Sequence, residues 1–252
     1  MLKEAQKDLL SVDNDGQFER IHGLTWFPWV GADYYSSNPR ILIVAESHYN
    51  YGQNVNQANE VAIRERWTTR NVVQSFAISK RDANNNKLTN NMFENLHRSL
   101  LGTANFNRES VWKNIAFYNF VQRPLNYNGN EYQKERPTFT DLQNGWHVFS
   151  EIVNILRPTL CVFVGTTAID NFAEYAIAQN IRNYSVTKEK PYDKAKRYAK
   201  KITFCKEELE LKCIAIQHTS RYFSWSKWNK YLKEEVPEII EFLITKSKIY
   251  QQ

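Results

Sequence analysis

The chain has few cysteines, and their arrangement excludes several kinds of site. The three cysteines, Cys161, Cys205 and Cys213, are odd in number and follow no metal-ligand spacing. Cys161 and Cys213 lie inside apolar, strand-like runs, so we expect both to be buried thiols. The pattern argues against a zinc ribbon and against an iron–sulfur cluster. We expect neither a metal nor a cofactor.

Long apolar runs are also missing, and we expect no targeting segment. No run approaches the roughly 18–20 apolar residues that a membrane-spanning helix needs. The first eight residues are polar and include Glu4 and Asp8, which is untypical of a signal peptide. We therefore expect a cytoplasmic protein without a membrane partner.

The length and composition fit one large α/β domain. The chain has 252 residues, of which 42% are hydrophobic and 14% aromatic, enough for a packed core. We expect a monomer whose single domain spans residues 1–252. Residues 1–39 form a lead-in, and residues 180–212 form an insertion. The aromatic patch at 26–30 is expected to pack against the edge of the core.

The formal net charge of +6 is compatible with a polyanionic partner. Residues 188–201 contain seven basic and two acidic side chains, with Tyr192 and Tyr198 interleaved. This segment is either a solvated face or a phosphate contact, and the two interpretations are compatible.

Continuous apolar runs predict four buried strands, at residues 40–45, 112–121, 159–165 and 211–217. Helical periodicity predicts helices at 89–101 and 143–157, a helix beginning at Thr166–Thr167, and a final helix that Pro237 kinks or splits. Strands that alternate with helices predict a three-layer α/β/α fold around a central, mostly parallel four-stranded sheet.

Polar and titratable residues lie at or just beyond the carboxyl end of each of these strands. The segments are Glu46-Ser47-His48-Tyr49, Asn119, Gly165-Thr166-Thr167 and His218-Thr219-Ser220. Ligands of an open α/β sheet bind beyond the carboxyl ends of its strands. The sequence therefore predicts one cleft with Glu46, Ser47, His48 and His218 at its rim. The backbone N–H groups near Thr166 and Thr167 can hold an anion.

The order of these segments resembles the uracil-DNA glycosylase superfamily. Residues 45–49 stand where that family has Gly-Gln-Asp-Pro-Tyr or Gly-Glu-Ala-Pro-Gly, and residues 117–121 are similar to the strand with its base-reading Asn. Residues 152–168 are similar to the helix, strand and Gly that follow. His218-Thr219-Ser220 stands at the place of the His-Pro-Ser loop.

The resemblance implies the fold of that superfamily and a protein that binds single- or double-stranded DNA, flips a uracil or another altered base and hydrolyses its N-glycosidic bond. It assigns catalytic roles to Glu46, Ser47 and His218: His218 stabilises the departing base, and Glu46 stabilises the sugar cation or activates water. The remaining residues implied are base-binding Asn119, Tyr49, Tyr51 and His48, and DNA-binding Ser220, Arg221, Tyr222, Thr166 and Thr167.

The chain departs from the family pattern at several positions. His48 and Thr219 stand where the family has Pro, and Ser47 stands where one branch has a water-activating Asp. The four cysteine ligands of the other branch are missing. A catalytically inactive nucleic-acid-binding relative, or a binding module without any catalysis, is therefore an alternative.

A second alternative is an ester hydrolase. The order Ser47, Asn119, His218 is similar to that of the Ser-Gly-Asn-His hydrolases. Ala45-Glu46-Ser47 is a poor match to their first block, however, and no Asp shortly precedes His218 to orient its imidazole.

Overall fold

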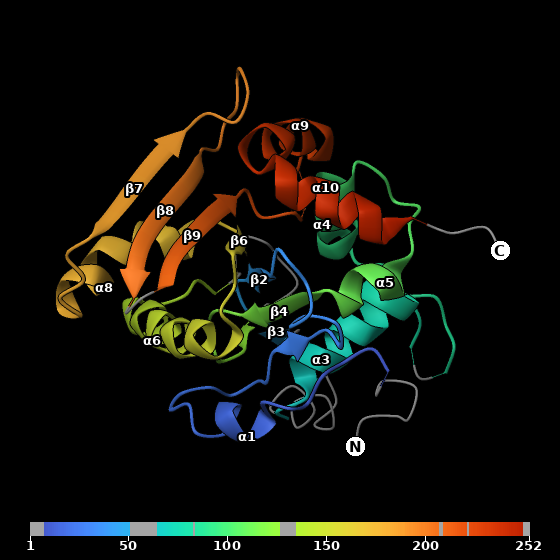
Figure 1. Ribbon diagram of the computed structural model, residues 1–252, viewed down its shortest axis with the longest axis horizontal. Helices are drawn as coiled ribbons and strands as arrows, with labels where there is room; N and C mark the ends of the chain where they lie inside the picture. Colours follow the sequence, from blue (N-terminus) through green and yellow to red (C-terminus); the bar gives the residue numbers. More distant parts are fainter. Residues whose placement is uncertain are drawn as a thin grey trace.

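A mixed seven-stranded sheet forms the centre of the protein (Figure 1). The computed structural model describes residues 8–50, 65–82, 84–126, 135–206, 209–220 and 222–248. In spatial order the strands are β1 (Trp29–Val30), β4 (Ile115–Asn119), β2 (Ile41–Ala45), β6 (Leu160–Val164), β9 (Leu209–Ile216), β8 (Ala199–Lys206) and β7 (Tyr184–Glu189).

The four predicted strands are the four central ones, and they run parallel to one another as β4-β2-β6-β9. The prediction of a four-stranded sheet is wrong, because antiparallel strands extend it at both edges. β1 has only two residues, and the side chains of β7 are mostly exposed, so neither carries the apolar run of a buried strand. The predicted insertion at 180–212 contributes β7, β8 and the start of β9.

The second predicted strand begins later in the structure than the sequence predicts. Residues 112–121 were expected to be extended, but Arg108–Lys113 form helix α5, and β4 starts only at Ile115. The Asn107 side chain accepts a hydrogen bond from the Ser110 N–H at 3.0 Å and caps this short helix. Local capping therefore decides the conformation around Trp112 despite its apolar neighbours.

Two hydrophobic cores cover the two faces of the sheet. Ile41 and Ile43 of β2 pack into one core, and Leu42 and Val44 into the other, as the alternation of a strand requires. The first face is covered by α3 (Thr68–Val72), the π-helical segment η3 (Val73–Ser79), α4 (Asn91–Leu101), α5, α9 (Trp225–Glu235) and α10 (Pro237–Ser247). The second is covered by α6 (Phe139–Leu156), α7 (Thr167–Asp170) and α8 (Phe172–Ala178). The predicted helix–sheet–helix layering is confirmed.

Helix ends follow the polar residues that cap them. Asn90 caps α4 by accepting hydrogen bonds from two backbone N–H groups of its first turn. Thr138 and Asp141 form a reciprocal capping box, so α6 begins at Phe139 rather than at residue 143. Pro237 occupies the first turn of α10 and separates it from α9, which confirms the predicted split.

The remaining short elements lie around this frame. They are α1 (Asp15–Phe18), β3 (Tyr49–Asn50) and β5 (Leu125–Asn126), and the last two pair with each other in parallel. Trp26, Phe27 and Trp29 are buried, as expected for the aromatic patch. The thiols of Cys161 and Cys213 are buried as well. Within the described ranges, no helix is long and apolar enough to cross a membrane.

Candidate functional site at the carboxyl edge of the parallel strands

The predicted motif segments meet at one edge of the sheet. Ala45 of β2 pairs with Asn119 of β4, Val44 lies beside Phe163 of β6, and Val164 lies beside Ile216 of β9. The four segments therefore leave four adjacent strands at nearly the same height. Neighbouring strands lie about 4.8 Å apart, so the edge from Asn119 to the His218 loop spans roughly 14 Å.

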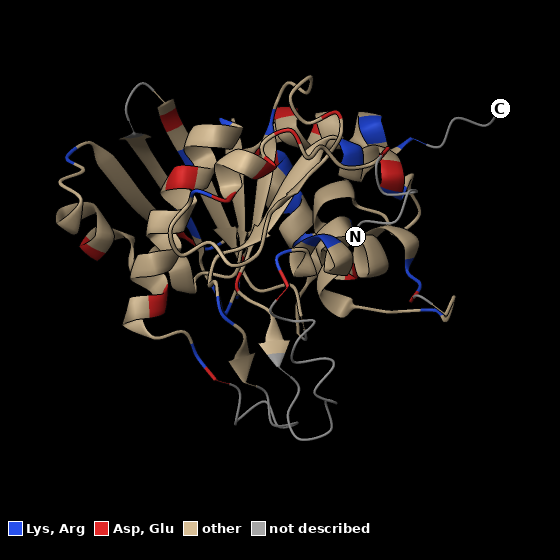
Figure 2. Ribbon diagram, turned by 90° about the horizontal axis from the view of Figure 1, so that it is seen from below, with Lys and Arg blue, Asp and Glu red and all other residues tan. Residues whose placement is uncertain are grey.

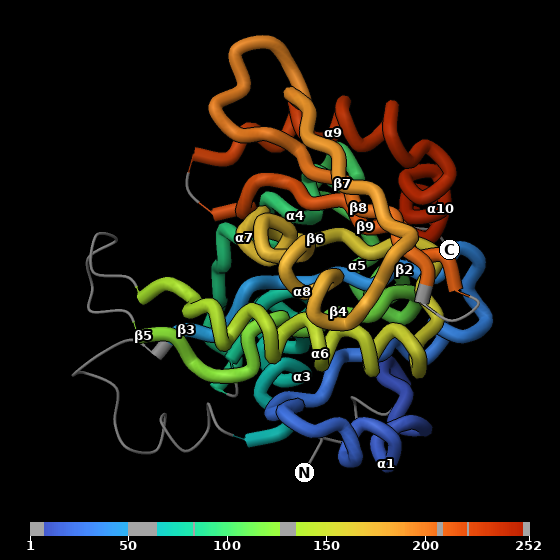
Figure 3. Tube along the Cα trace, turned by 90° about the vertical axis from the view of Figure 1, so that its left-hand side faces the viewer, coloured from blue at the N-terminus to red at the C-terminus, as the bar shows by residue number. Residues whose placement is uncertain are grey.

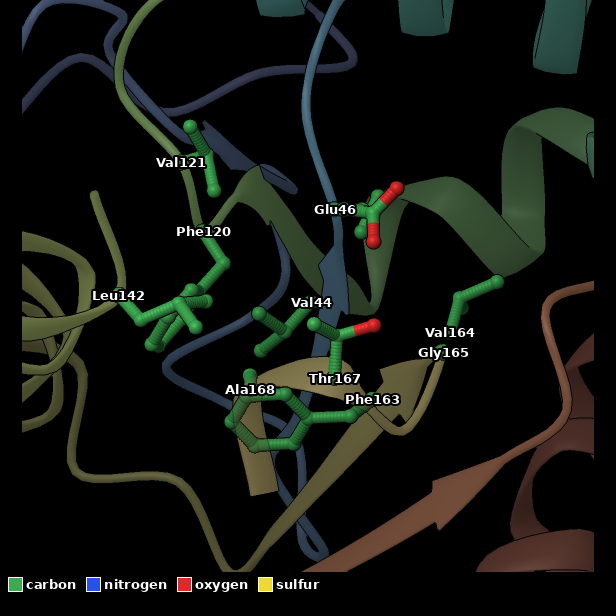
Figure 4. A pocket seen from close by; sticks show the side chains of 11 residues that line it. Val44, Glu46, Phe120, Val121, Leu142, Phe163, Val164, Gly165, Thr167 and Ala168 are labelled. Atoms are coloured by element: carbon green, nitrogen blue, oxygen red, sulfur yellow. The ribbon is translucent and has the colours of Figure 1, made fainter. Parts of the chain in front are cut away.

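Glu46 is one of the residues that line a pocket at this edge (Figure 4). Among the described lining residues, Glu46 and Thr167 have polar side chains, and the others are apolar or glycine. Residues of β2, β6, α6 and α7 and the chain after β4 form those walls: Val44, Ala45, Phe120, Val121, Leu142, Phe163, Val164, Gly165 and Ala168. The Tyr49 hydroxyl donates a hydrogen bond to Glu46 Oε2 at 2.8 Å and orients this carboxylate. A carboxylate thus forms part of the wall of a largely apolar pocket.

Ser47 has a structural role in this arrangement. Its hydroxyl donates a hydrogen bond to the backbone carbonyl of Arg123 at 2.6 Å, which joins the segments that follow β2 and β4. Arg123 in turn makes a bidentate pair with Asp141 and contacts Glu135 at 2.7 Å. The hydrogen bond with Asp141 is the main cause that raises the pKa of the Arg123 guanidinium. Ser47 therefore belongs to a network that fixes the chain.

His48 and Asn119 are linked through a residue that the sequence did not suggest. His48 Nε2 lies 3.0 Å from Thr69 Oγ1, and the Thr69 hydroxyl donates to Asn119 Oδ1 at 3.4 Å. A threonine hydroxyl has one proton, so Thr69 accepts from His48, and His48 carries its proton on Nε2. Burial lowers the pKa of His48 to about 4. The neutral ring packs edge-on against Trp26, with 4.6 Å between ring centroids.

The oxygen of the Asn119 side chain is thereby occupied. Gln122 donates to the Asn119 backbone carbonyl, which fixes the residue further. Among the described residues, the Asn119 amide nitrogen has no hydrogen-bond partner. Asn119 is therefore a buried, oriented side chain with a donor left for a ligand.

The His218 loop defines the tautomer of its own histidine. The backbone N–H of Ser220 donates to His218 Nδ1 at 3.3 Å, and the Ser220 hydroxyl lies 2.9 Å from the same nitrogen. A backbone N–H can only donate, so Nδ1 accepts and the neutral ring carries its proton on Nε2. His218 is therefore oriented to present an N–H donor.

Helix α4 holds this loop in place. The Asn95 amide donates to the carbonyls of Thr219 and Ser220 at 2.9 and 3.1 Å. The hydroxyl of the fully buried Thr219 donates to the Met92 carbonyl at 2.8 Å. Asn95, like Thr69, was missed, because its role depends on contacts between segments far apart in the sequence.

Gly165 and the two threonines after it lie between Glu46 and His218. Gly165 has a φ of +130°, where only glycine is unstrained, and a Cβ on it would meet His218 Cδ2 at 3.9 Å. Thr166 precedes α7 without capping it through its side chain, and Thr167 lines the pocket. The predicted helix at these threonines is confirmed, although α7 is only four residues long and α8 follows it.

The remaining predicted base-binding and DNA-binding residues are described only in part. Tyr51 and Arg221 lie outside the described residues. Tyr222 is 93% exposed, and its backbone carbonyl accepts a hydrogen bond from Gln217 at 3.3 Å. Phe223 turns inward and stacks on Trp228 at 6.0 Å between centroids. Tyr222 is thus an exposed aromatic beside the His218 loop.

Two further observations delimit the site. A second hollow, lined by Glu151, Arg182 and Cys205 among others, lies on the face covered by α6 and α8 and contains none of the predicted residues. Within the part of the chain that the structure describes, no group of three or more His, Cys, Asp or Glu side chains is arranged to hold a metal ion.

Comparisons with known proteins add no relative. No protein-family model matches the chain, and no curated protein matches it in sequence.

Proposed function

We propose that the protein binds DNA and hydrolyses the N-glycosidic bond of a flipped uracil or other altered base, as a divergent member of the uracil-DNA glycosylase superfamily. The observation that carries this proposal is the meeting of four motif segments at the carboxyl edge of four adjacent parallel strands. Ligand sites of open α/β sheets occur at this edge.

The two outer residues supply hydrogen-bond donors. Base excision leaves negative charge on the departing base, and a donor aimed at that charge lowers the barrier. His218 has the required tautomer, with the proton on Nε2, because the Ser220 N–H occupies Nδ1. The Asn119 amide nitrogen has no partner among the described residues, so it is suited to hold an acceptor on the base edge.

Glu46 supplies negative charge between these donors. A carboxylate there stabilises the cationic sugar that forms as the bond breaks, or activates the attacking water. Its hydrogen bond from Tyr49 engages Oε2, and Oε1 makes no hydrogen bond with the described residues. Tyr49 therefore acts in this proposal as a positioning residue for Glu46 rather than as a base-binding residue.

The geometry favours this proposal over an ester hydrolase. A serine triad needs a histidine whose Nδ1–H donates to a carboxylate and whose free Nε2 takes the serine proton. His218 has the opposite arrangement, since its Nδ1 accepts from a backbone N–H. The Ser47 hydroxyl donates to the Arg123 carbonyl, so it is not available as a nucleophile.

The test is excision from labelled oligonucleotides, single- and double-stranded, that contain uracil, hypoxanthine or other modified bases. We expect His218→Ala to lose at least about 100-fold in rate, the range of a lost transition-state donor, while its affinity for DNA is retained. His22→Ala changes an exposed histidine that is not among the predicted site residues and is the control. Equal excision by wild type and His218→Ala contradicts the assignment of the site. DNA binding without excision of any base supports the inactive, nucleic-acid-binding alternative instead.

A further inference from the structure

The connection between β7 and β8 projects from the same edge of the sheet as the candidate site. β8 runs antiparallel to β9, and its first residues pair with the last residues of β9, as Lys200 does with Ala215. β7 ends where β8 begins, with Glu189 paired to Ala199. Residues 190–198 join β7 to β8. β8 is the direct neighbour of β9, the strand that leads into His218.

This connection is packed against the rest of the protein. The Tyr192 ring contacts Trp228 of α9 at 6.4 Å between centroids, and the Lys227 ammonium lies 4.7 Å from the Tyr192 ring centroid. Ala195 is buried. The connection lies beside α9 in two views of the molecule (Figures 1 and 3). Its charges are thus held at a defined place beside the His218 loop.

The connection carries more positive than negative charge, and its exposed cations form no ion pair with the described residues. Lys190, Lys194, Lys196 and Arg197 are exposed and make no ion pair within the described ranges, and Asp193 is the one acidic residue between positions 190 and 198. By contrast, Lys200 pairs with Asp170, and Lys201 pairs with Glu189 and Glu235.

Over much of the rest of the ribbon, basic and acidic residues are interspersed (Figure 2). Exposed cations that are not neutralised by the protein are available to phosphate groups.

We infer that Lys190, Lys194, Lys196 and Arg197, here called the basic connection, bind the phosphate backbone of the nucleic acid whose altered base enters the site at Glu46 and His218. The inference rests on the proposed function for the identity of the ligand. It adds a second contact region, one that holds the strand beside the pocket without touching the reacting bond. An anionic membrane would also attract the basic connection. It would not explain why the basic connection lies next to the strand-end motifs.

The test compares two quadruple variants with equal changes in charge. The first is K190Q/K194Q/K196Q/R197Q. The control is R20Q/R182Q/K212Q/K248Q, which removes four exposed cations outside this connection. Both variants lower the formal net charge from +6 by four units. DNA binding is measured by fluorescence anisotropy between about 50 and 200 mM salt, the range in which phosphate contacts weaken strongly.

For duplex DNA we expect the slope of log affinity against log salt to be shallower by roughly 3–4 in the first variant, because each phosphate contact contributes about 0.9. The control keeps the wild-type slope. Excision at saturating DNA is unchanged, whereas the DNA concentration for half-maximal rate increases. If the quadruple variant melts at a lower temperature than wild type, K194Q/R197Q serves instead, with about half the change in slope.

Equal salt slopes in the two quadruple variants overturn the inference. So does a loss of binding to phosphatidylserine vesicles while binding to DNA is kept. Failure of the catalytic proposal is seen separately: wild type then excises no base, although the basic connection still determines the salt slope.

Discussion

Replacing His48 with glutamine removes a buried titrating group from the site. His48 is 9% exposed, and burial lowers its pKa to about 4 from an ordinary 6.5. Glutamine is similar in length and can donate to Thr69 as the histidine Nε2–H does, but it does not titrate. The variant therefore isolates the cost of burying a neutral imidazole.

The sign and size of the effect follow from the two pKa values. Above pH 6.5 the imidazole is neutral in both the folded and the unfolded chain, so His48 adds no pH dependence. Between pH 6.5 and 4 the unfolded chain binds a proton that the folded chain does not, so the free energy of unfolding falls as the pH is lowered. The difference of 2.5 pKa units corresponds to about 3 kcal/mol of stability lost by pH 4.

Urea unfolding of wild type and His48→Gln at several pH values between 7.5 and 4.5 measures this loss. We expect the wild-type-minus-variant difference in free energy of unfolding to decrease by about 2–3 kcal/mol across that range. His97, whose pKa is also lowered by burial and by nearby Arg108, is present in both proteins, so its contribution cancels. His22→Gln, at an exposed position, is the control and follows wild type. A difference that stays constant from pH 7.5 to 4.5 refutes the reasoning.

Two further predictions concern the frame of the site. Gly165→Ala is expected to lower the free energy of unfolding by about 1–3 kcal/mol through backbone strain at φ +130°. The distance of 3.9 Å to His218 leaves room for the methyl group, so strain and not a clash causes the loss. An unchanged melting temperature would contradict this. Asn95→Ala leaves the Thr219 and Ser220 carbonyls without their donor, and we expect chemical denaturation to show a loss of about 1–3 kcal/mol in the free energy of unfolding. Asn84→Ala, at an exposed turn, is the neutral control. Equal stability of the two variants would argue against the anchoring role of Asn95.

The parallel core of the fold was predictable from the sequence, and the edges of the sheet were not. Continuous apolar runs identify β2, β6 and β9 because both faces of these strands are buried. β7 has no continuous apolar run, because its side chains are mostly exposed. Its pairing with β8 is made by backbone hydrogen bonds that any sequence can form. The apolar neighbours of Trp112 favour a strand, whereas the cap at Asn107 starts helix α5 there.

The candidate site was predictable as a set of segments but not as a set of contacts. The rule that ligands bind at carboxyl ends of strands brought Glu46, Asn119 and His218 to one edge. It gave no sign that Ser47 would donate to a carbonyl. Thr69 and Asn95 contribute to the site from helices on one face, and nothing in their local sequence distinguishes them from other polar residues of helices. Such contacts depend on packing between segments far apart in the chain.

Two positions, at which the chain differs from the superfamily that its motifs resemble, illustrate how the candidate site is held. Proline restrains a loop by fixing its own φ angle, without any partner. His48 and Thr219 are both buried, and each is hydrogen-bonded across the fold, to Thr69 and to the Met92 carbonyl. These contacts tie the segments after β2 and β9 to helices α3 and α4, where prolines would have stiffened each loop alone. Tertiary contacts thus restrain both segments without a proline, and the carboxyl edge of the sheet is ordered at these two positions.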